Sequence, residues 1–384
     1  MAWLHAFALL CIYVLSTEAV VKAPLDSCVH QCATHYESAE IASLTFVRDI
    51  TARNKVADSQ MFKAMHYDMS TNISYYAERF NVKGNAGLAL SNSTDPSSIE
   101  LHGYDIQAED PRIFYWRNEK YILFIHFRKK YGRILAITKY NHFDPIPLHI
   151  KSERINRVEK NWGPFVKDNE LYIVYNYDPL VILHYDGNLK GLCKVVYKQN
   201  GTNLPVDTAP QILRGGSNLV PYDKNERYFI AGCHSRVAGY SELKTIFFTH
   251  FTHLLILDTL TSWQVIYASK PLLFPYTDVI FYNGVNYTFL NKSIYFDNTM
   301  NIQDPVSINR LTQNEYVFTS NIQDQISLEF LLHININNII KNHETSQLPF
   351  KREISYWNSQ IKNYTTSLIE TRKLCLLQQK YKSN

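Results

Sequence analysis

Hydrophobic and polar residues alternate in short runs along most of the chain, and three of these runs share one layout. Each contains a strand-like stretch, a polar turn carrying Asn-Glu and a second strand-like stretch: EDPRIFYWRNEKYILF, KNWGPFVKDNELYIVY and GSNLVPYDKNERYFIAG. A period of two with frequent Tyr, Ile, Val and Phe predicts β-strands and excludes a helical solenoid.

The spacing of these hairpins predicts the architecture. The Asn-Glu pairs stand at 118–119, 169–170 and 225–226, so they are 51 and 56 residues apart. That spacing is close to the length of one four-stranded propeller blade. We therefore predict an all-β protein with the fold of a five-bladed β-propeller.

Weaker copies of the pattern indicate which residues the propeller includes. They occur in FPYTDVIFYNGVNYTFL from Phe274 and NRLTQNEYVFTSN from Asn309, and FNVKGNAGLALS supplies a further strand pair ahead of Asp105. The propeller is expected over residues 45–350. The last residues, 351–384, are typical of a short amphipathic helix or a frayed tail.

The N-terminus predicts entry into the secretory pathway. An apolar stretch from about Ala6 to Leu15 precedes small residues, so residues 1–23 are interpreted as a signal peptide or a signal anchor, followed by an extension over 24–44. The expected location is secreted or in the lumen of the endoplasmic reticulum or Golgi, without membrane contact beyond an N-terminal anchor. N-glycosylation motifs agree with this compartment and stand at Asn72, Asn92, Asn200, Asn286, Asn291 and Asn363.

Composition narrows the possible ligands. The chain has 384 residues, a net charge of +4 and no basic block, so nucleic acid is not expected as a partner. No C-x-x-C pair is present, which argues against structural zinc, and no metal is predicted. His250 and His253 are three apart on a predicted strand and should face opposite sides. Cys233 and His234 are adjacent, so a cysteine nucleophile beside His234 is not expected either.

Polar residues recur at one offset in the repeat. Asp110, Asn161 and Ser217 each lie eight residues before the Asn of their turn. Equivalent positions of a radial repeat meet around one axis, and chemically different residues at one such position favour a site assembled from several blades. Their polar neighbours are Glu109, Arg112, Lys160, Arg214 and Asn218.

These motifs resemble a known family. AEDPRIF is similar to the acidic motif of the five-bladed-propeller β-mannoside phosphorylases and hydrolases of glycoside hydrolase family 130, and of related eukaryotic β-mannosyltransferase/phosphorylases. VEKNWGPFVKDNELYIVYNYDPLVIL, RGGSNLVPYDKNERYFIAGCHSR and NIQDQISL resemble the following motifs in the same order. The resemblance runs from about Tyr104 to Ile334 and is poor between about 265 and 310. The usual glycine of the fifth-blade motif is replaced by Asn321.

The resemblance implies an enzyme that cleaves or forms β-mannosidic bonds. Asp110 would be the general acid, and inorganic phosphate would attack the anomeric carbon with inversion. The implied partner is an oligosaccharide or mannose-containing glycan, with phosphate or a sugar phosphate as co-substrate and no other cofactor. Substrate-binding residues would be Glu109, Arg112, Asn161, Trp162, Asp178, Ser217, Asn218, Tyr240 and Asp324. Phosphate-binding residues would be Lys160, Arg214, His234 and Arg236.

Several alternatives remain open at this stage. Glu109 would raise the pKa of Asp110, whereas pairing with Arg112 would lower it. Gly215 and Gly216 suit either a close backbone approach to an anion or a turn with positive φ. Hydrolysis would need a second carboxylate roughly 6.5–9.5 Å from the acid, with Asp178 or Glu159 as first candidates. A secreted carbohydrate-binding propeller without turnover and a protein-interaction propeller are the alternatives from other classes. The oligomeric state is not predicted.

Overall fold

The fold is taken from a computed structural model. It describes residues 41–50, 59–82, 85–95, 99–102, 107–128, 132–151, 162–177, 179–199, 213–240, 246–260, 263–270, 272, 303–322 and 326–345. The signal segment, Lys160, Asn161, Asp178, Asp324 and the predicted tail lie outside these residues. No helix within the described residues is long and apolar enough to cross a bilayer.

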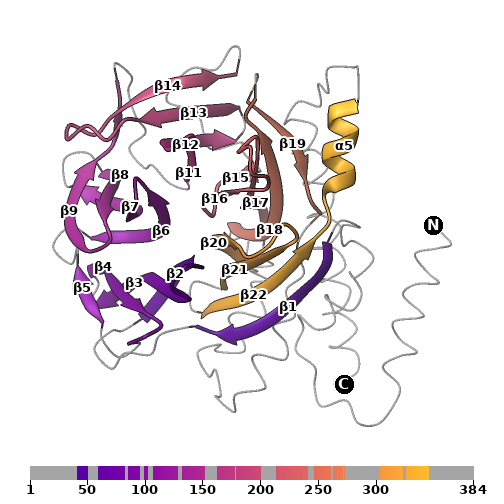
Figure 1. The fold of residues 1–384 in the computed structure, drawn as a ribbon. Helices are drawn as coiled ribbons and strands as arrows, with labels where there is room; N and C mark the ends of the chain where they lie inside the picture. The colour runs from indigo at the N-terminus through magenta and orange to yellow at the C-terminus, as the bar shows by residue number, and fades with distance from the viewer. Residues whose placement is uncertain are drawn as a thin grey trace, which may run out of the picture.

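The described strands form five sheets arranged around one centre (Figure 1), and their strands pair antiparallel except for the short strand β10 (His149–Ile150). The five-bladed propeller is therefore confirmed. The first blade contains β2 (Ser59–Asp68), β3 (Ile73–Val82), β4 (Asn85–Asn92) and β5 (Glu100–His102). The second contains β6 (Ala108–Trp116), β7 (Glu119–Arg128), β8 (Gly132–Lys139) and β9 (His142–Pro147). The third contains β11 (Gly163–Lys167), β12 (Glu170–Tyr177), β13 (Leu180–Tyr185) and β14 (Leu192–Lys198), with β10 (His149–Ile150) parallel to β14.

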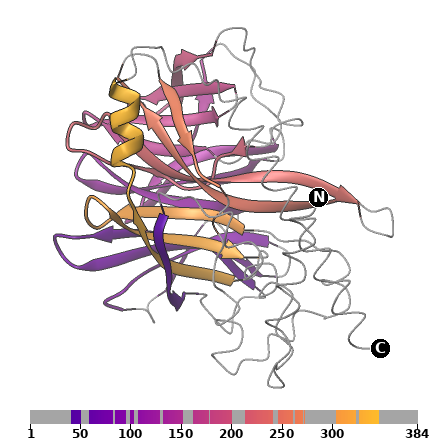
Figure 2. The ribbon, with the colours of Figure 1, turned by 90° about the vertical axis from the view of Figure 1, so that its right-hand side faces the viewer.

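The fourth and fifth blades depart from this plan. In the fourth, β15 (Leu213–Arg214) and β16 (Leu219–Pro221) both pair with β17 (Tyr228–Tyr240), which is followed by β18 (Ile246–Asp258) and β19 (Gln264–Ala268). The hairpin of β17 and β18 reaches beyond the other strands (Figure 2). The fifth contains β20 (Gln303–Arg310), β21 (Glu315–Ile322), β22 (Ile326–Ile334) and the N-terminal strand β1 (Ile41–Asp49). Helix α5 (Asn337–Thr345) follows it.

Left-handed turn residues set the register of the hairpins. Arg117 and Asn118 have φ of 50° and 61°, and Asp168 and Asn169 have φ of 51° and 60°. Two consecutive positive φ values are typical of the type I′ turn, whose twist matches that of the flanking strands, and Asn tolerates this conformation well. The Asn-Glu signal in the sequence therefore marks these turns correctly.

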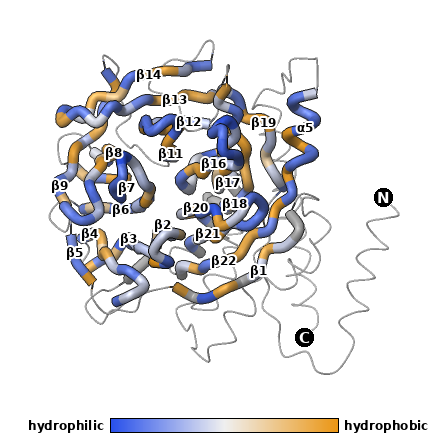
Figure 3. Tube along the Cα trace, viewed as in Figure 1, coloured by the Kyte–Doolittle hydropathy of each residue, from blue (hydrophilic) through white to orange (hydrophobic). Residues whose placement is uncertain are grey.

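The hydrophobic cores lie between neighbouring blades. The alternation of hydrophobic and hydrophilic positions along the strands (Figure 3) gives each sheet apolar side chains to bury against its neighbours. Fully buried Phe124, Trp116, Phe165 and Phe318 belong to the clusters between blades one and two, two and three, three and four, and four and five, respectively.

The seam between blades five and one is polar in the described residues. The side-chain oxygens of Ser307 and Ser327 accept hydrogen bonds from the backbone N–H groups of β2 at Met65 and Lys63. Asn309 accepts one from Tyr67 and donates one to the Met65 carbonyl. These contacts satisfy buried backbone groups that have no sheet partner at this edge.

Asn321, the residue that replaces the usual family glycine, belongs to the same seam. Its side chain is fully buried, and Oδ1 accepts a hydrogen bond of 3.3 Å from the Phe62 N–H. This departure from the motif therefore has a structural reason.

The ring closes through strands from opposite ends of the sequence. β1 pairs antiparallel with β22, and Arg48 of β1 forms an ion pair of 3.0 Å with Glu329 of β22. Arg48 also donates to the Tyr76 hydroxyl of blade one, at 2.9 Å. One strand thus completes blade five and connects it to blade one.

Replacing Asn309 by Ala should lower the free energy of unfolding by about 2 kcal/mol, because a buried N–H and a buried carbonyl of β2 lose their partner. Chemical denaturation of the two proteins measures this difference. Asn335→Ala, at an exposed position, is the matched control and should change it by less than about 0.5 kcal/mol. Equal stability of both variants would show that the seam does not depend on the Asn309 amide.

Candidate active site at the centre of the propeller

A bulge in the innermost strand of blade two places Asp110. The pairing of β6 with β7 shifts register between Glu109 and Arg112, and Asp110 has φ of 49°. A residue before proline is usually extended, but the bulge takes Asp110, which precedes Pro111, into the left-handed region. A non-glycine residue in that region is strained, and such strain concentrates at functional sites.

An arginine from blade one binds both neighbouring carboxylates. The guanidinium of Arg79 lies 3.5 Å from Asp110 Oδ1 and 3.6 Å from Glu109 Oε1. Arg133 lies 3.4 Å from the same Glu109 oxygen. The other carboxylate oxygen, Glu109 Oε2, is buried and has no hydrogen-bond partner among the described residues. Buried carboxylate oxygens normally accept a hydrogen bond, so this oxygen lacks a donor.

Arg112 crosses the centre from blade two to blade four. It is 4% exposed and donates to the carbonyls of Gly216 and Pro111. Its bond to Asp110 goes to the backbone carbonyl, at 3.3 Å, so the carboxylate pairs with Arg79 instead. Burial lowers the pKa of Arg112, although Asp110 and Asp304 act against that change.

The glycine next to this bond has a packing role. A Cβ on Gly216 would lie 2.3 Å from Pro305 Cγ, so no larger residue fits. Gly215 and Gly216 are not among the residues with positive φ, so the turn interpretation is wrong for both. The close approach at Gly216 is to Pro305 of blade five.

Blade four presents a cationic and imidazole face. In the strand register, Arg214 of β15 lies opposite His234 of β17, and Arg236 of β17 lies opposite His250 of β18. Directly paired residues share a face, and so do alternate residues of one strand, so these four side chains lie on one side of the sheet. Burial, and then the charge of Arg236, lowers the pKa of Arg214 to about 10.

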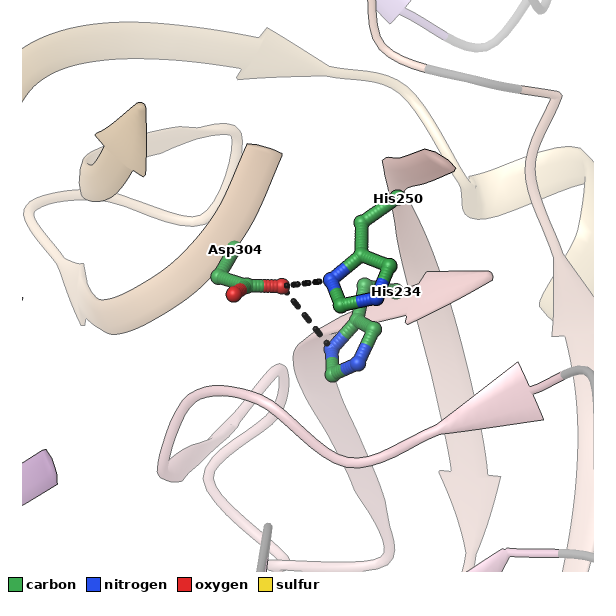
Figure 4. A group of neighbouring side chains, drawn as sticks. All are labelled: His234, His250 and Asp304. Carbon is green, nitrogen blue, oxygen red and sulfur yellow. Dashed lines mark hydrogen bonds and ion pairs between the residues drawn. The ribbon is translucent and has the colours of Figure 1, made fainter. Parts of the chain in front are cut away.

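Asp304 of blade five meets this face (Figure 4). Its Oδ1 is 3.0 Å from His250 Nδ1 and 3.5 Å from His234 Nδ1. Burial lowers the pKa of His234 to about 3, so this ring is neutral near pH 7. Burial acts to raise the pKa of Asp304, but His234, His250 and Arg112 outweigh it and leave that pKa below its usual range.

Other predicted residues have structural contacts. Ser217 is fully buried and its hydroxyl bonds within blade four. The Asn218 amide binds both backbone groups of Ile308 in blade five. Trp162 is 2% exposed and packs in the core between blades two and three. It also borders a small recess lined by Asp110, Arg112, Leu123, Ile125, Leu135 and Trp162.

Tyr240 is far from these residues along strand β17. It pairs with Ile246 at the end of the β17–β18 hairpin, six residues beyond His234 and roughly 20 Å along the strand. Lys160, Asn161, Asp178 and Asp324 lie outside the described residues. The structure therefore brings together Glu109, Asp110, Arg112, Arg214, His234 and Arg236.

Sequence reasoning missed Arg79, Arg133, His250 and Asp304. For Asp304 a signal was present: Asp304-Pro305 in blade five repeats Asp110-Pro111 of blade two, and β20 also shifts register beside its proline. His250 and His253 do face opposite sides, as predicted, but only His253 is a fully buried packing residue. Cys233 shares the His253 side, and burial raises the pKa of its thiol.

Comparisons with known proteins agree with the motif resemblance. No protein-family model matches the sequence. "Beta-mannosyltransferase 2" of Komagataella phaffii is 28% identical over 148 residues, which is 34% of this chain and only 22% of that relative. The match therefore spans less than a quarter of the curated relative's length.

Solved structures share the fold. A glycosyl hydrolase of Bacteroides ovatus has a TM-score of 0.50 and 9% identity, covering 77% of this chain and 92% of its own. A protein of Parabacteroides distasonis has a TM-score of 0.50 and 11% identity, covering 77% and 95%. At such identities the likeness shows a common fold.

Acid should destabilise the protein partly through His253. The ring donates its Nδ1–H to the Ser269 carbonyl, and Nε2 accepts a hydrogen bond from the Ser235 hydroxyl. Burial lowers the pKa of His253 to about 4. The unfolded chain binds a proton below about pH 6.5 while the folded chain does not, so stability falls as pH drops from 6.5 towards 4. His253→Gln should remove about 2 kcal/mol of the stability lost between pH 7 and pH 5. Urea unfolding at both pH values measures it, with exposed His149→Gln as control. An unchanged loss in His253→Gln would contradict the assignment.

Proposed function

We propose that this protein is a carbohydrate-active enzyme that cleaves or forms β-mannosidic bonds, by inverting phosphorolysis or by mannosyl transfer. The observation that carries the proposal is the meeting of an acidic pair and a cationic face at one centre. Blades one and two supply Arg79, Glu109 and Asp110, and blades four and five supply Arg214, His234 and Asp304. The β-mannosyltransferase match and the ordered motifs support the choice of mannosides.

The acidic pair suits a sugar. Carboxylates accept hydrogen bonds from hydroxyl groups, and Glu109 Oε2 is a buried acceptor available for one. Arg79 fixes the orientation of both carboxylates through its two nitrogens. We assign the mannosyl unit to this side, with Asp110 directed to the glycosidic oxygen, either directly or through a sugar hydroxyl.

The cationic face suits phosphate. The described side chains at the centre include the carboxylates of Glu109, Asp110 and Asp304 and five guanidiniums, namely Arg79, Arg112, Arg133, Arg214 and Arg236. His234 is neutral and adds no charge, so positive charge is in excess among these side chains and a bound anion would balance it. Inorganic phosphate or a sugar phosphate is the expected co-substrate.

The reaction follows from this placement. In phosphorolysis a phosphate oxygen attacks the anomeric carbon from the face opposite the leaving group. The bond from that carbon to the glycosidic oxygen breaks, and the leaving oxygen takes the proton of Asp110. The product is an α-mannosyl phosphate, and the reverse reaction transfers mannose to an acceptor. The Asp110 carboxylate also contacts Arg79. A carboxylate held by an arginine suits hydrogen bonding to sugar hydroxyls, and this contact is the observation that favours a carbohydrate-binding propeller without turnover as the second candidate.

We place this activity in the secretory lumen or outside the cell. The motif Asn72 supports the placement, because it lies exposed in the turn between β2 and β3 with φ of 58°. A glycan at that position would extend into solvent. The signal segment itself lies outside the described residues.

Asp110→Asn should reduce the release of mannose 1-phosphate from β-linked mannobioses and phosphate by about 100-fold or more, because the amide cannot donate the proton. The measurement is a coupled assay for mannose 1-phosphate with purified proteins. Asp144→Asn, at an exposed position of β9, is the matched control and should retain activity. Mannobiose binding without turnover in every variant would select the carbohydrate-binding function. The absence of binding would favour the protein-interaction propeller.

Arg214→Gln should raise the KM for phosphate by about 10-fold or more with a smaller effect on kcat, because a charge-assisted contact to the anion is lost. Initial rates at varied phosphate concentration give both constants. Arg117→Gln is the control, since the Arg117 side chain is 43% exposed and pairs with Glu170 in blade three. A KM that stays at the wild-type value would remove Arg214 from the phosphate site.

A further inference from the structure

His234, His250 and Asp304 converge on one small volume between blades four and five. Figure 4 shows both Nδ1 atoms directed at the same carboxylate oxygen. The possible ligand atoms of the three residues all lie within 4.8 Å of one another. We propose that this triad, referred to below as the His-His-Asp triad, binds a divalent first-row transition metal such as zinc.

The distances fit one ion between the three groups. Zinc bound to imidazole nitrogen or carboxylate oxygen at about 2.0–2.1 Å in tetrahedral geometry separates its ligand atoms by roughly 3.3 Å. The Asp304 oxygen lies 3.0 Å from His250 Nδ1 and 3.5 Å from His234 Nδ1. The two stacked imidazole rings would turn towards each other's plane so that all three ligand atoms, which lie within 4.8 Å of one another, could contact one metal.

An unsatisfied nitrogen is the second observation. His234 is 3% exposed, and its Nδ1 is buried without a hydrogen bond to any described residue, being 3.5 Å from Asp304. A buried polar atom without a hydrogen bond is costly, and a metal would satisfy it. Both Nδ1 atoms are directed at the shared Asp304 oxygen, and the two rings are stacked with centroids 4.8 Å apart.

The ligand types select the class of metal. Two imidazoles and one carboxylate suit Zn²⁺, Fe²⁺ or Mn²⁺, whereas Mg²⁺ prefers oxygen ligands and water. Three protein ligands leave a position open for water or an anion. The sequence argues against structural zinc of the Cys-rich type, and the His-His-Asp triad is a different kind of site.

Neighbouring charges determine when the metal binds well. Arg112, Arg214 and Arg236 contribute to the electrostatics of the triad, and their positive charges oppose a further cation. An anion in the open position would offset this repulsion, so phosphate should increase the affinity for zinc. Coordination through Nδ1 would also leave each ring with an Nε2–H donor. The metal site rests on the triad alone and does not require the proposed reaction.

Zinc binding by the full chain tests this proposal. The protein is first stripped of metal with a chelator, and the chelator is removed. It is then titrated with zinc in a calorimeter, once in phosphate-free buffer and once in the same buffer with a phosphate monoester that does not precipitate zinc. Metal content after dialysis is measured by mass spectrometry. We expect one zinc per chain, tighter binding with the phosphate monoester and no binding of Mg²⁺.

Variants identify the ligands. His250→Gln and Asp304→Asn should each weaken zinc binding by about 100-fold or more. His149→Gln replaces an exposed histidine on β10 and should bind zinc as the wild type does. Cobalt supplies a spectroscopic signature, because visible bands of four-coordinate Co²⁺ should appear with the wild type and with His149→Gln and disappear with His250→Gln.

Two results would overturn the proposal. One is zinc affinity unchanged in both His250→Gln and Asp304→Asn, which would place the metal at other histidines. The other is no zinc binding by the folded wild type with or without the phosphate monoester. Near-ultraviolet circular dichroism confirms that the proteins compared are folded, and the cobalt spectrum of the wild type stands even if one variant unfolds.

Discussion

Closure of the ring is the constraint on which the centre depends. The pairing of β1 with β22 completes blade five, and the polar seam holds that blade against β2. Blade five supplies Asp304, which contacts the histidines of blade four, and blade one supplies Arg79, which contacts Asp110 of blade two. If the ring opened at this seam, the site residues of blade five would separate from those of blade one.

The centre is organised as a buried ionic network. Charges removed from water are costly unless opposite charges and hydrogen bonds compensate them. Arg112 shows how this is achieved, because its guanidinium binds carbonyls of two different blades while Asp110 and Asp304 supply negative charge nearby. A network of buried carboxylates and guanidiniums contributes little to stability by itself. Under the proposed function it would serve to bind a charged or hydroxyl-rich ligand.

Local signals in the sequence predicted the blades well. Asn118 and Asn169 mark tight turns because few residue types adopt positive φ without a large cost, so position and conformation are linked at short range. The 51-residue spacing then placed Asp110 at the axis. Closure by β1 was not predicted, because Ile41 and Ile334 lie at opposite ends of the propeller sequence and no local pattern specifies such a partner. The Asp110 bulge and the contact between His250 and Asp304 also depend on tertiary packing, which a strand period cannot specify.

The pairing of β1 with β22 also determines when the propeller can finish folding during synthesis. The ribosome makes β1 first and its partner about 285 residues later, so the strand must wait for nearly the whole propeller before it can pair. Contacts so distant in sequence slow folding, since a large loop has to be ordered before they form. During synthesis the nascent chain therefore has an unpaired strand edge, and the candidate site is complete only when the last blade has formed.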